Sequence, residues 1–400
     1  MTITTNPLKD EEQKKAINTW LANRGKGTLQ LCTSFGKTYT AIKAALFLKK
    51  TWDRDINILI LAPTEVIRDD VWKKEFAKWK QTAFYNKHCH TECIQTAYKW
   101  QGTKWDLVIA DEIHNYLSPE FSAFFFNNQI KTIIGLSAKI PPTYINTLNR
   151  IAPIVYSLSI QEAMEKGIVA PFEHYVHKFP LAPEERRQYN KINSTYAYYE
   201  SQFGGPYKAF TTAGTWMKSG SDDEKKIAAV YYGQVRQRKT LLYNAKGKVK
   251  ETIKILDQYP NAKVIIFSET KKFAESIADA REDCVAYHSG MGKKARAAAL
   301  AAFKDKRTKV RAVSSVKALN EGWDVPDLTI AIIASGPSTS KDFIQRVGRA
   351  VRYLEGKRAI VVNLCVEDSQ EEKWVKKRTE GFPYKQTTNV KEIVYGTDKV

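Results

Sequence analysis

The sequence has no apolar stretch approaching the roughly 18 uninterrupted residues of a membrane-spanning helix. Its first residues, MTITTNPLKDEEQKK, carry acidic side chains and lack the apolar core of a signal peptide. Cysteine is scarce and odd in number, with 5 in 400 residues, so a disulfide framework is not expected. These absences exclude membrane-embedded and disulfide-rich secreted proteins, and we expect a cytoplasmic protein with no membrane partner.

Acidic residues are also in short supply, because 43 Asp and Glu stand against 63 Lys and Arg, a net charge of +20. Such an excess attracts polyanions, above all nucleic acid, through Lys and Arg that neutralise phosphates. A Lys-rich solubilising surface would show the same excess, so charge alone does not decide. The length and the 43% of hydrophobic residues favour a globular chain of two domains.

Two series of short apolar runs predict two α/β domains. The runs are continuous rather than alternating, as in strands covered on both faces of a parallel sheet, and helix-like segments separate them. They lie at 28–32, 56–62, 106–110 and 132–137, and again at 263–268, 309–315, 328–335 and 359–366. We therefore predict an α/β fold of two parallel-sheet domains in tandem, residues 1–155 and 251–400.

Residues 171–250 lack this rhythm and are predicted to form a helical, Tyr-rich connector or insertion. Between Arg236 and Lys254 there are seven Lys or Arg against one acid. Aromatic and basic side chains together suit base stacking and phosphate contact, which would make Arg236, Arg238 and Lys239 nucleic-acid-binding residues. The tyrosines could equally pack the connector's own core while the basic residues form a solvated face. The sequence leaves both interpretations open.

A phosphate-binding loop is indicated by Gly36, Lys37 and Thr38, which follow an apolar run and precede a helix-like segment. Backbone N–H groups, including those of Ser34 and Gly36, would face the anion together with the helix dipole. Lys37 would reach the outer phosphates, and the Thr38 hydroxyl would bind Mg²⁺. The full phosphate-loop pattern requires glycine at position 31, where this chain has Leu31.

Asp111 and Glu112 follow the apolar run 106–110 directly. A carboxylate at the carboxyl end of a strand, beside a phosphate loop, can hold Mg²⁺, and the next can polarise the attacking water. We therefore predict ATP and Mg²⁺ as cofactors, Lys37, Asp111 and Glu112 as catalytic residues, and Thr38 and Asp111 as metal ligands.

Seven segments in the expected order resemble the motifs of superfamily 2 helicases. They are CTSFGKT at 32–38, APTEV at 62–66, ADEIH at 110–114, LSA at 136–138, IIFSE at 265–269, LNEGWD at 319–324 and QRVGRAVR at 345–352. The last, Q-x-x-G-R-x-x-R, is highly specific. The resemblance implies two RecA-like domains, with ATP bound between them and nucleic acid lying across both.

The same resemblance implies roles for residues that spacing alone would not reveal. Gln13 matches the glutamine that reads adenine in many relatives, although a solvent-facing glutamine at a helix start would look the same. Arg349 and Arg352 match arginine fingers, which act on the phosphates when the domains close. The residues that match further nucleotide-site positions are Gly322, Asp324 and Gln345.

The resemblance also places nucleic-acid backbone contacts at Thr64, Gln95 and Thr96, and at the turn that holds His288. Contacts to phosphates carry no sequence information, which suits a motor that steps along any sequence. Ser137 is expected near Asp111 and Glu112, where it would couple the nucleotide state to the grip on nucleic acid.

The chain departs from the family pattern at two positions. Ser34 stands where most relatives have glycine, as in some phage branch-migrating helicases, and Lys139 stands where they usually have threonine. The DEIH segment is similar to DEAH rather than DEAD sequences. We expect an ATP-dependent helicase or translocase that acts as a monomer on duplex or branched DNA in preference to RNA. An RNA helicase, a restriction-type motor subunit and a nucleic-acid-binding protein with a degenerate ATPase are the alternatives.

Overall fold

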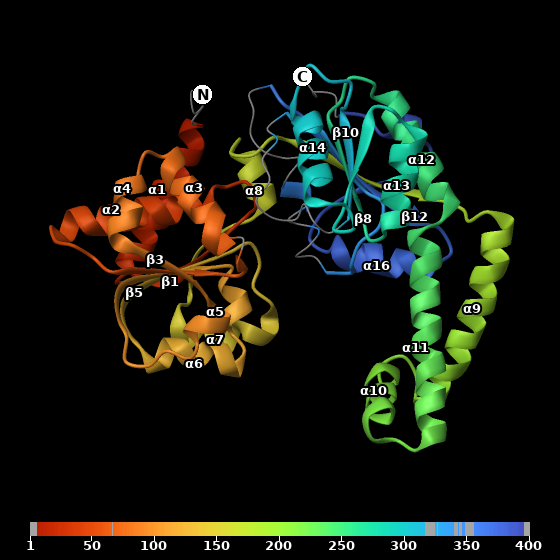
Figure 1. The fold of residues 1–400 in the computed structure, drawn as a ribbon, viewed down its shortest axis with the longest axis horizontal. Helices are drawn as coiled ribbons and strands as arrows, with labels where there is room; N and C mark the ends of the chain where they lie inside the picture. Colours follow the sequence, from red (N-terminus) through yellow and green to blue (C-terminus); the bar gives the residue numbers. More distant parts are fainter. Residues whose placement is uncertain are drawn as a thin grey trace. The chain divides into compact units, whose positions relative to one another are not determined.

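The computed structural model describes residues 6–395 apart from 66, 317–324, 326, 340–342, 344–345 and 349–355. Most residues up to Pro171 form one compact unit, and most of those from Phe172 onward form a second (Figure 1). Each unit is built on a parallel sheet with helices packed against it, so the predicted α/β class with two RecA-like domains in tandem is confirmed. Within the described part of the chain, no helix is both long and apolar enough to cross a membrane.

The first sheet has six strands within the described residues, in the order β3-β2-β4-β5-β1-β6. Their bounds are β1 (Lys26–Leu31), β2 (Ile58–Ala62), β3 (Cys89–Cys93), β4 (Lys104–Asp111), β5 (Gln129–Ser137) and β6 (Ile154–Leu158). The four predicted runs of this half became the four inner strands. The edge strands β3 and β6 were not predicted, because an edge strand is partly solvated and needs no continuous apolar run.

Helices cover both faces of the first sheet, with α1 to α4 on one side and α5 to α7 on the other (Figure 1). On the second face, Phe124 and Leu148 pack in one core with Leu61 and Val108. The helices of this unit are α1 (Pro7–Ala22), α2 (Lys37–Trp52), α3 (Trp72–Lys78), α4 (Thr82–His88), α5 (Ile94–Ala97), α6 (Pro119–Asn127), α7 (Ile145–Ile151) and α8 (Ile160–Glu165).

The second sheet has seven described strands, in the order β13-β7-β12-β11-β8-β10-β9. Their bounds are β7 (Phe172–Phe179), β8 (Val264–Ser268), β9 (Cys284–Tyr287), β10 (Ala312–Val316), β11 (Ile330–Ile333), β12 (Ala359–Val366) and β13 (Lys385–Thr387). The packed helices are α12 (Lys246–Gln258), α13 (Lys271–Ala280), α14 (Lys293–Lys304) and α16 (Gln370–Arg378).

Strand β7 differs from the prediction, which assigned residues 171–250 to a helical connector. It pairs with β12 along its whole length, with Phe172 opposite Ala359 and Phe179 opposite Val366. Its sequence, FEHYVHKF, mixes polar residues with aromatic ones, and His174 and His177 are buried within it. No continuous apolar run therefore marked it as a strand.

The remainder of the predicted connector forms a helical arm, residues 183–243. It consists of α9 (Pro183–Gln202), α10 (Ala209–Ser219) and α11 (Asp222–Tyr243), and Figure 1 shows α9 and α11 side by side, leading away from the second sheet. The arm has its own core, in which Phe203 and Tyr231 are buried and Tyr196 stacks on Tyr231 with ring centroids 5.4 Å apart. Other aromatic side chains face solvent, and Tyr207 is 97% exposed. The core-packing interpretation is therefore confirmed for the buried rings, while base stacking by the exposed ones stays a prediction.

Candidate nucleotide and nucleic-acid site

The predicted phosphate loop connects β1 to α2. Ser34 and Gly36 both adopt left-handed backbone conformations, with φ of 66° and 92°. Glycine adopts this conformation without strain, and Ser34 adopts it here although it has a side chain. A Cβ added to Gly36 would lie 2.9 Å from Gln13 Nε2, and its φ of 92° is a conformation that residues with a side chain rarely adopt. Lys37 and Thr38 open α2, whose first N–H groups have no partner within the helix.

Side chains of helix α1 donate hydrogen bonds to the backbone of this loop. Gln13 is only 3% exposed, its Nε2 donates to the Phe35 carbonyl oxygen at 3.0 Å, and its Oε1 accepts from Lys43 Nζ at 3.1 Å. Lys9 Nζ donates to the carbonyl oxygen of Ser34 at 2.5 Å. The alternative of a solvent-facing Gln13 is therefore wrong, while its contact with adenine stays a prediction.

The structure brings Lys37 together with the DEIH segment. Lys37 Nζ lies 3.1 Å from Glu112 Oε1, and both side chains are largely buried. Asp111 ends β4, where Trp72 Nε1 donates to its Oδ2 at 3.2 Å and the Tyr116 hydroxyl donates to its backbone oxygen at 2.6 Å. The site thus places an ammonium and two carboxylates at the carboxyl edge of one parallel sheet.

A second contact links this segment to the end of β5. His114 Nδ1 lies 2.8 Å from Ser137 Oγ, and Ser137 is fully buried and donates to the Lys139 carbonyl oxygen at 3.0 Å. His114 Nδ1 also lies 3.4 Å from Glu112 Oε2. The predicted proximity of Ser137 to this segment is confirmed, and the His114 imidazole contacts both Ser137 and Glu112.

The donor groups at this site fit Mg²⁺. A threonine hydroxyl from the first turn of α2 and a carboxylate from the end of β4 are hard oxygen ligands, and Mg²⁺ is commonly held by one or two such groups together with substrate phosphates. The described residues contain no group of three or more His, Cys, Asp or Glu that could hold a metal by itself. A Mg²⁺ ion held by Thr38 and Asp111 would therefore take its remaining ligands from water and from the nucleotide phosphates.

Three predicted nucleic-acid contacts lie at the carboxyl edge of the same sheet. Thr64 follows β2, and Gln95 and Thr96 follow β3; all three residues are exposed. Strands β2 and β3 are parallel neighbours, with Ala62 opposite Cys93. Parallel neighbours end at the same edge, so these three residues share one accessible surface.

The predicted contacts in the second unit have mixed outcomes. His288 is 4% exposed and its Nε2 lies 3.0 Å from Glu275 Oε1, and its contact with nucleic acid stays a prediction. Arg238 is 6% exposed; its guanidinium lies 3.7 Å from the centroid of the Tyr196 ring, and its Nη1 donates to Asn193 Oδ1 at 3.0 Å. Arg238 fastens α11 to α9, which corrects its assignment as a nucleic-acid contact.

The other two predicted nucleic-acid contacts of that basic run, Arg236 and Lys239, are exposed. The predicted nucleotide-site residues Gly322, Asp324, Gln345, Arg349 and Arg352 lie outside the described residues.

Two family models match this sequence and divide it as the fold does. Residues 8–141 match the model described as type III restriction enzyme, res subunit, and residues 247–354 match the helicase conserved C-terminal domain. The chain belongs to superfamily 2 of the helicases and translocases. Membership implies an enzyme that hydrolyses ATP and has nucleic acid as its partner.

Relatives of this superfamily 2 chain include one that spans nearly its whole length. DNA 3'-5' translocase XPB2 of Sulfurisphaera tokodaii is 25% identical over 393 residues, covering 92% of this chain and 84% of the relative. The probable ATP-dependent RNA helicase Dbp45A of Drosophila melanogaster is 33% identical over 103 residues, which is 25% of this chain and 19% of that protein. The solved Hef helicase domain of Pyrococcus furiosus has a TM-score of 0.57 at 15% identity, over 93% of this chain and 98% of that one, and shows the same fold.

The superfamily 2 motifs did not reveal every residue that shapes the site. Trp72 was missed, because a tryptophan on the apolar side of a helix normally serves the core, and only its indole N–H at Asp111 distinguishes it. Lys9 and Lys43 were missed because a lysine in a charged helix carries no signal of what it contacts.

Proposed function

We propose that this superfamily 2 protein is an ATP-driven translocase that acts on duplex or branched DNA as a monomer. The observation that carries the proposal is the pairing of Lys37 with Glu112 at the same sheet edge as the exposed Thr64, Gln95 and Thr96. One edge thus offers phosphate chemistry and, beside it, a polar surface for a polynucleotide backbone. DNA is favoured over RNA because the relative named a DNA translocase matches 92% of the chain, whereas Dbp45A matches 25%.

The chemistry begins with a change of partner at Lys37. Its ammonium leaves Glu112 and moves to the outer phosphates of ATP, where the α2 N-terminus already favours negative charge. Thr38 and Asp111 would hold Mg²⁺, which when bound neutralises charge on the transferring phosphoryl group. Glu112, released from Lys37, orients the attacking water and accepts its proton.

The remaining parts of the nucleotide site come from sequence alone. Arg349 and Arg352 act as arginine fingers that stabilise charge in the transition state. Gly322, Asp324 and Gln345 complete the nucleotide site together with Gln13, which reads adenine.

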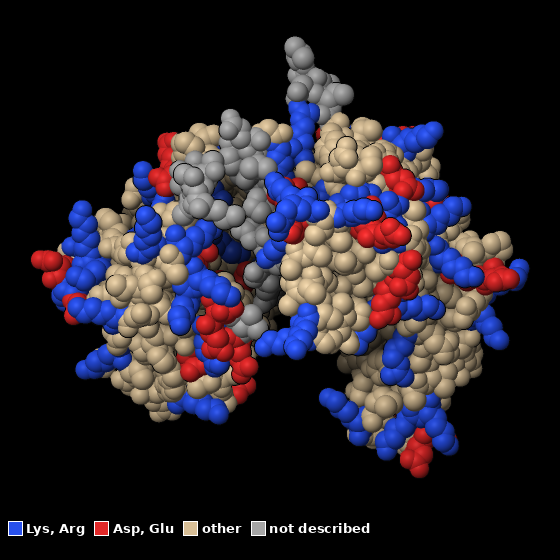
Figure 2. Space-filling model, turned by 45° about the horizontal axis from the view of Figure 1, so that its top comes forward, with Lys and Arg blue, Asp and Glu red and all other residues tan. Residues whose placement is uncertain are grey.

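The grip on nucleic acid is proposed to use backbone contacts alone. Thr64, Gln95 and Thr96 offer short polar side chains, and Arg236 and Lys239 offer positive charge on α11. Figure 2 shows Lys and Arg side chains spread over the whole visible face, with Asp and Glu in smaller groups among them. Such a surface attracts the phosphate backbone of any sequence.

The test is the rate of ATP hydrolysis against single-stranded DNA, duplex DNA, a fork, a four-way junction and RNA, with Lys37→Ala as the inactive control. We expect duplex or branched DNA to stimulate turnover most. Stronger stimulation by RNA would replace the proposal by an RNA helicase. No turnover with any polynucleotide would favour the binding protein with a degenerate ATPase.

A further inference from the structure

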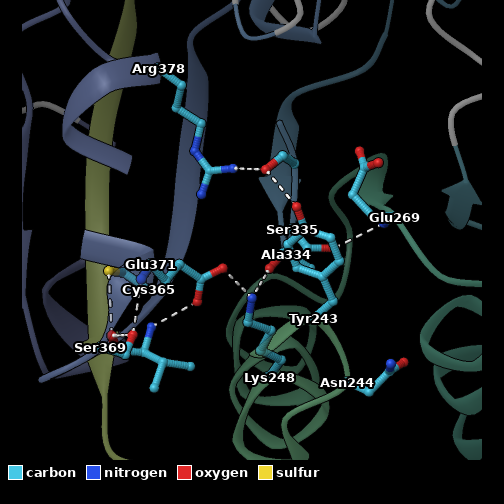
Figure 3. A network of polar contacts seen from close by, with 12 residues as sticks. Tyr243, Asn244, Lys248, Glu269, Ala334, Ser335, Cys365, Ser369, Glu371 and Arg378 are labelled. Atoms are coloured by element: carbon cyan, nitrogen blue, oxygen red, sulfur yellow. Dashed lines mark hydrogen bonds and ion pairs between the residues drawn. The ribbon is translucent and has the colours of Figure 1, made fainter. Parts of the chain in front are cut away.

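A lysine is fully buried inside the second unit. Lys248, on α12, and Glu371, on α16, are each 0% exposed, and their Nζ and Oε1 atoms lie 2.5 Å apart (Figure 3). Lys248 Nζ also donates to the Ala334 carbonyl oxygen at 2.6 Å, and Glu371 Oε2 accepts the Val366 N–H at 3.0 Å. Burial lowers the pKa of Lys248, against the opposing effect of Glu371. A buried ion pair adds little net stability over apolar residues of similar volume, so stability alone does not explain it.

The lysine is one of three donors that hold a single short segment. This segment, residues 334–336, follows β11 directly. Arg378 Nη1, from α16, donates to the Gly336 carbonyl oxygen at 3.0 Å, and the Tyr243 hydroxyl approaches the same oxygen at 3.5 Å. The backbone N–H groups of Ala334 and Ser335 donate to the Phe267 carbonyl oxygen at 2.9 and 3.3 Å. Three helices thus converge on two carbonyl groups.

Both long helices of the arm are rooted in this network. Tyr243, which approaches Gly336, is the last residue of α11. On α9, Arg186 donates to the carbonyl oxygens of Glu367 and Asp368, both at 2.8 Å. The Tyr189 hydroxyl accepts the Gln370 N–H at 2.8 Å, next to Glu371 in the chain. A tilt of the arm would therefore displace its contacts at Gly336 and at residues 367–370 together.

The segment held by the network leads along the chain to Q-x-x-G-R-x-x-R at 345–352. We propose that Lys248, Glu371 and Arg378 are positioning residues that couple the arm to residues 334–336. When the arm engages a polynucleotide, the network sets the path of these residues, which precede the Q-x-x-G-R-x-x-R motif in the sequence. The inference rests on the proposed function, since it assigns the stimulation of ATP hydrolysis by nucleic acid to a route through the arm.

The size of the effect follows from the bonds that hold the segment. A hydrogen bond from a charged donor is worth a factor of about 10 to 100 in an equilibrium. Removing Lys248 alone would leave Glu371 buried and unpaired, and the protein would lose stability for that reason. The double change Lys248→Met with Glu371→Gln removes both charges, keeps the volume and retains an acceptor for the Val366 N–H.

The experiment measures ATP turnover of the full chain with and without duplex DNA, together with thermal stability. In the double variant we expect turnover stimulated by DNA to fall about tenfold while turnover without DNA stays within about twofold of the parent. The matched control is Lys178→Met with Glu372→Gln. The Lys178 and Glu372 side chains lie 2.7 Å apart. Their ion pair joins α16 to β7, next to Glu371 in the chain, and not α16 to residues 334–336. The control should keep full stimulation.

An equal fall of both rates, or no change in either, would overturn the coupling role. If the double variant does not fold, Arg378→Lys serves instead, because it keeps the charge and one donor. It should lose less stimulation than the double variant, about threefold, and unchanged stimulation would again overturn the proposal. Failure of the proposed function looks different, since the parent itself would then show no stimulation by DNA.

Discussion

The substitution Glu112→Gln offers the sharpest test of the nucleotide site. Glu112→Gln keeps the shape of the side chain and removes its charge. In the structure the Lys37 ammonium is held 3.1 Å from this carboxylate, with 14% and 16% of the two side chains exposed. ATP must therefore compete with Glu112 for Lys37, and neutralising Glu112 weakens the competitor.

The magnitude follows from the kind of hydrogen bond that changes. A bond to a charged acceptor is about 1 kcal/mol stronger than one to a neutral acceptor, so Lys37 should be released about fivefold more readily. We expect Glu112→Gln to bind ATP equally tightly or up to about fivefold more tightly. Its kcat should fall by about 10²-fold or more, because the proton acceptor is gone. Lys37→Ala should abolish turnover as well, but with weaker ATP binding.

The assay is calorimetric or fluorescence titration with ATP, followed by single-turnover hydrolysis. The matched control is Glu92→Gln. Glu92 lies on β3, away from the phosphate loop; its side chain is 17% exposed and lies 3.2 Å from Arg68 Nη1. It should change neither ATP affinity nor kcat. Turnover of Glu112→Gln at the parent rate would refute the role of Glu112, and ATP binding as weak as in Lys37→Ala would refute the competition.

Three further predictions concern other parts of the chain. Arg349→Ala or Arg352→Ala should lower kcat by about 10³-fold with little change in ATP affinity, and unchanged kcat in both would remove the arginine fingers from the mechanism. Arg236→Ala with Lys239→Ala should weaken duplex binding alike for all sequences and lower the log–log salt slope by about 1.8, measured from 50 to 200 mM salt; Arg238→Ala, the control, should lower thermal stability and leave the slope unchanged. The hydrogen bond from Arg281, opposed by burial and aided by Arg311, lowers the pKa of the Asp283 carboxyl below its ordinary 3.8. Asp283 therefore stabilises the fold above pH 3.8 and loses this effect as the pH falls through its folded pKa, so Asp283→Asn should be less stable by about 1 kcal/mol at pH 7 and equal to the parent at low pH in urea unfolding.

The sequence predicted the inner strands well because burial on both faces requires continuous apolar residues. It did not predict β7, whose buried polar side chains find partners only once the sheet has formed. His177 Nε2, for example, lies 2.9 Å from Glu251 Oε2 on α12. Such partners are far apart in the chain, and no local pattern announces them.

The candidate site shows the same division. The approach of Lys37 to Glu112 was predictable, because parallel strands bring loops from their carboxyl ends to one edge. Arg238 was misassigned because a basic run was treated as one surface. In an α-helix, however, a residue two positions from Arg236 points to nearly the opposite side, and here that side faces α9.

The place of β7 in the second sheet has a consequence for synthesis on the ribosome. Its two neighbours in the sheet, β12 and β13, both come late in the chain. Phe172 therefore cannot pair until Ala359 has been synthesised. At ordinary elongation rates that interval is on the order of 10–40 s. During it the arm can fold on its own small core, while β7 presents two unpaired edges that invite aggregation. The nascent second unit is therefore the stage at which chaperones should matter most for this protein.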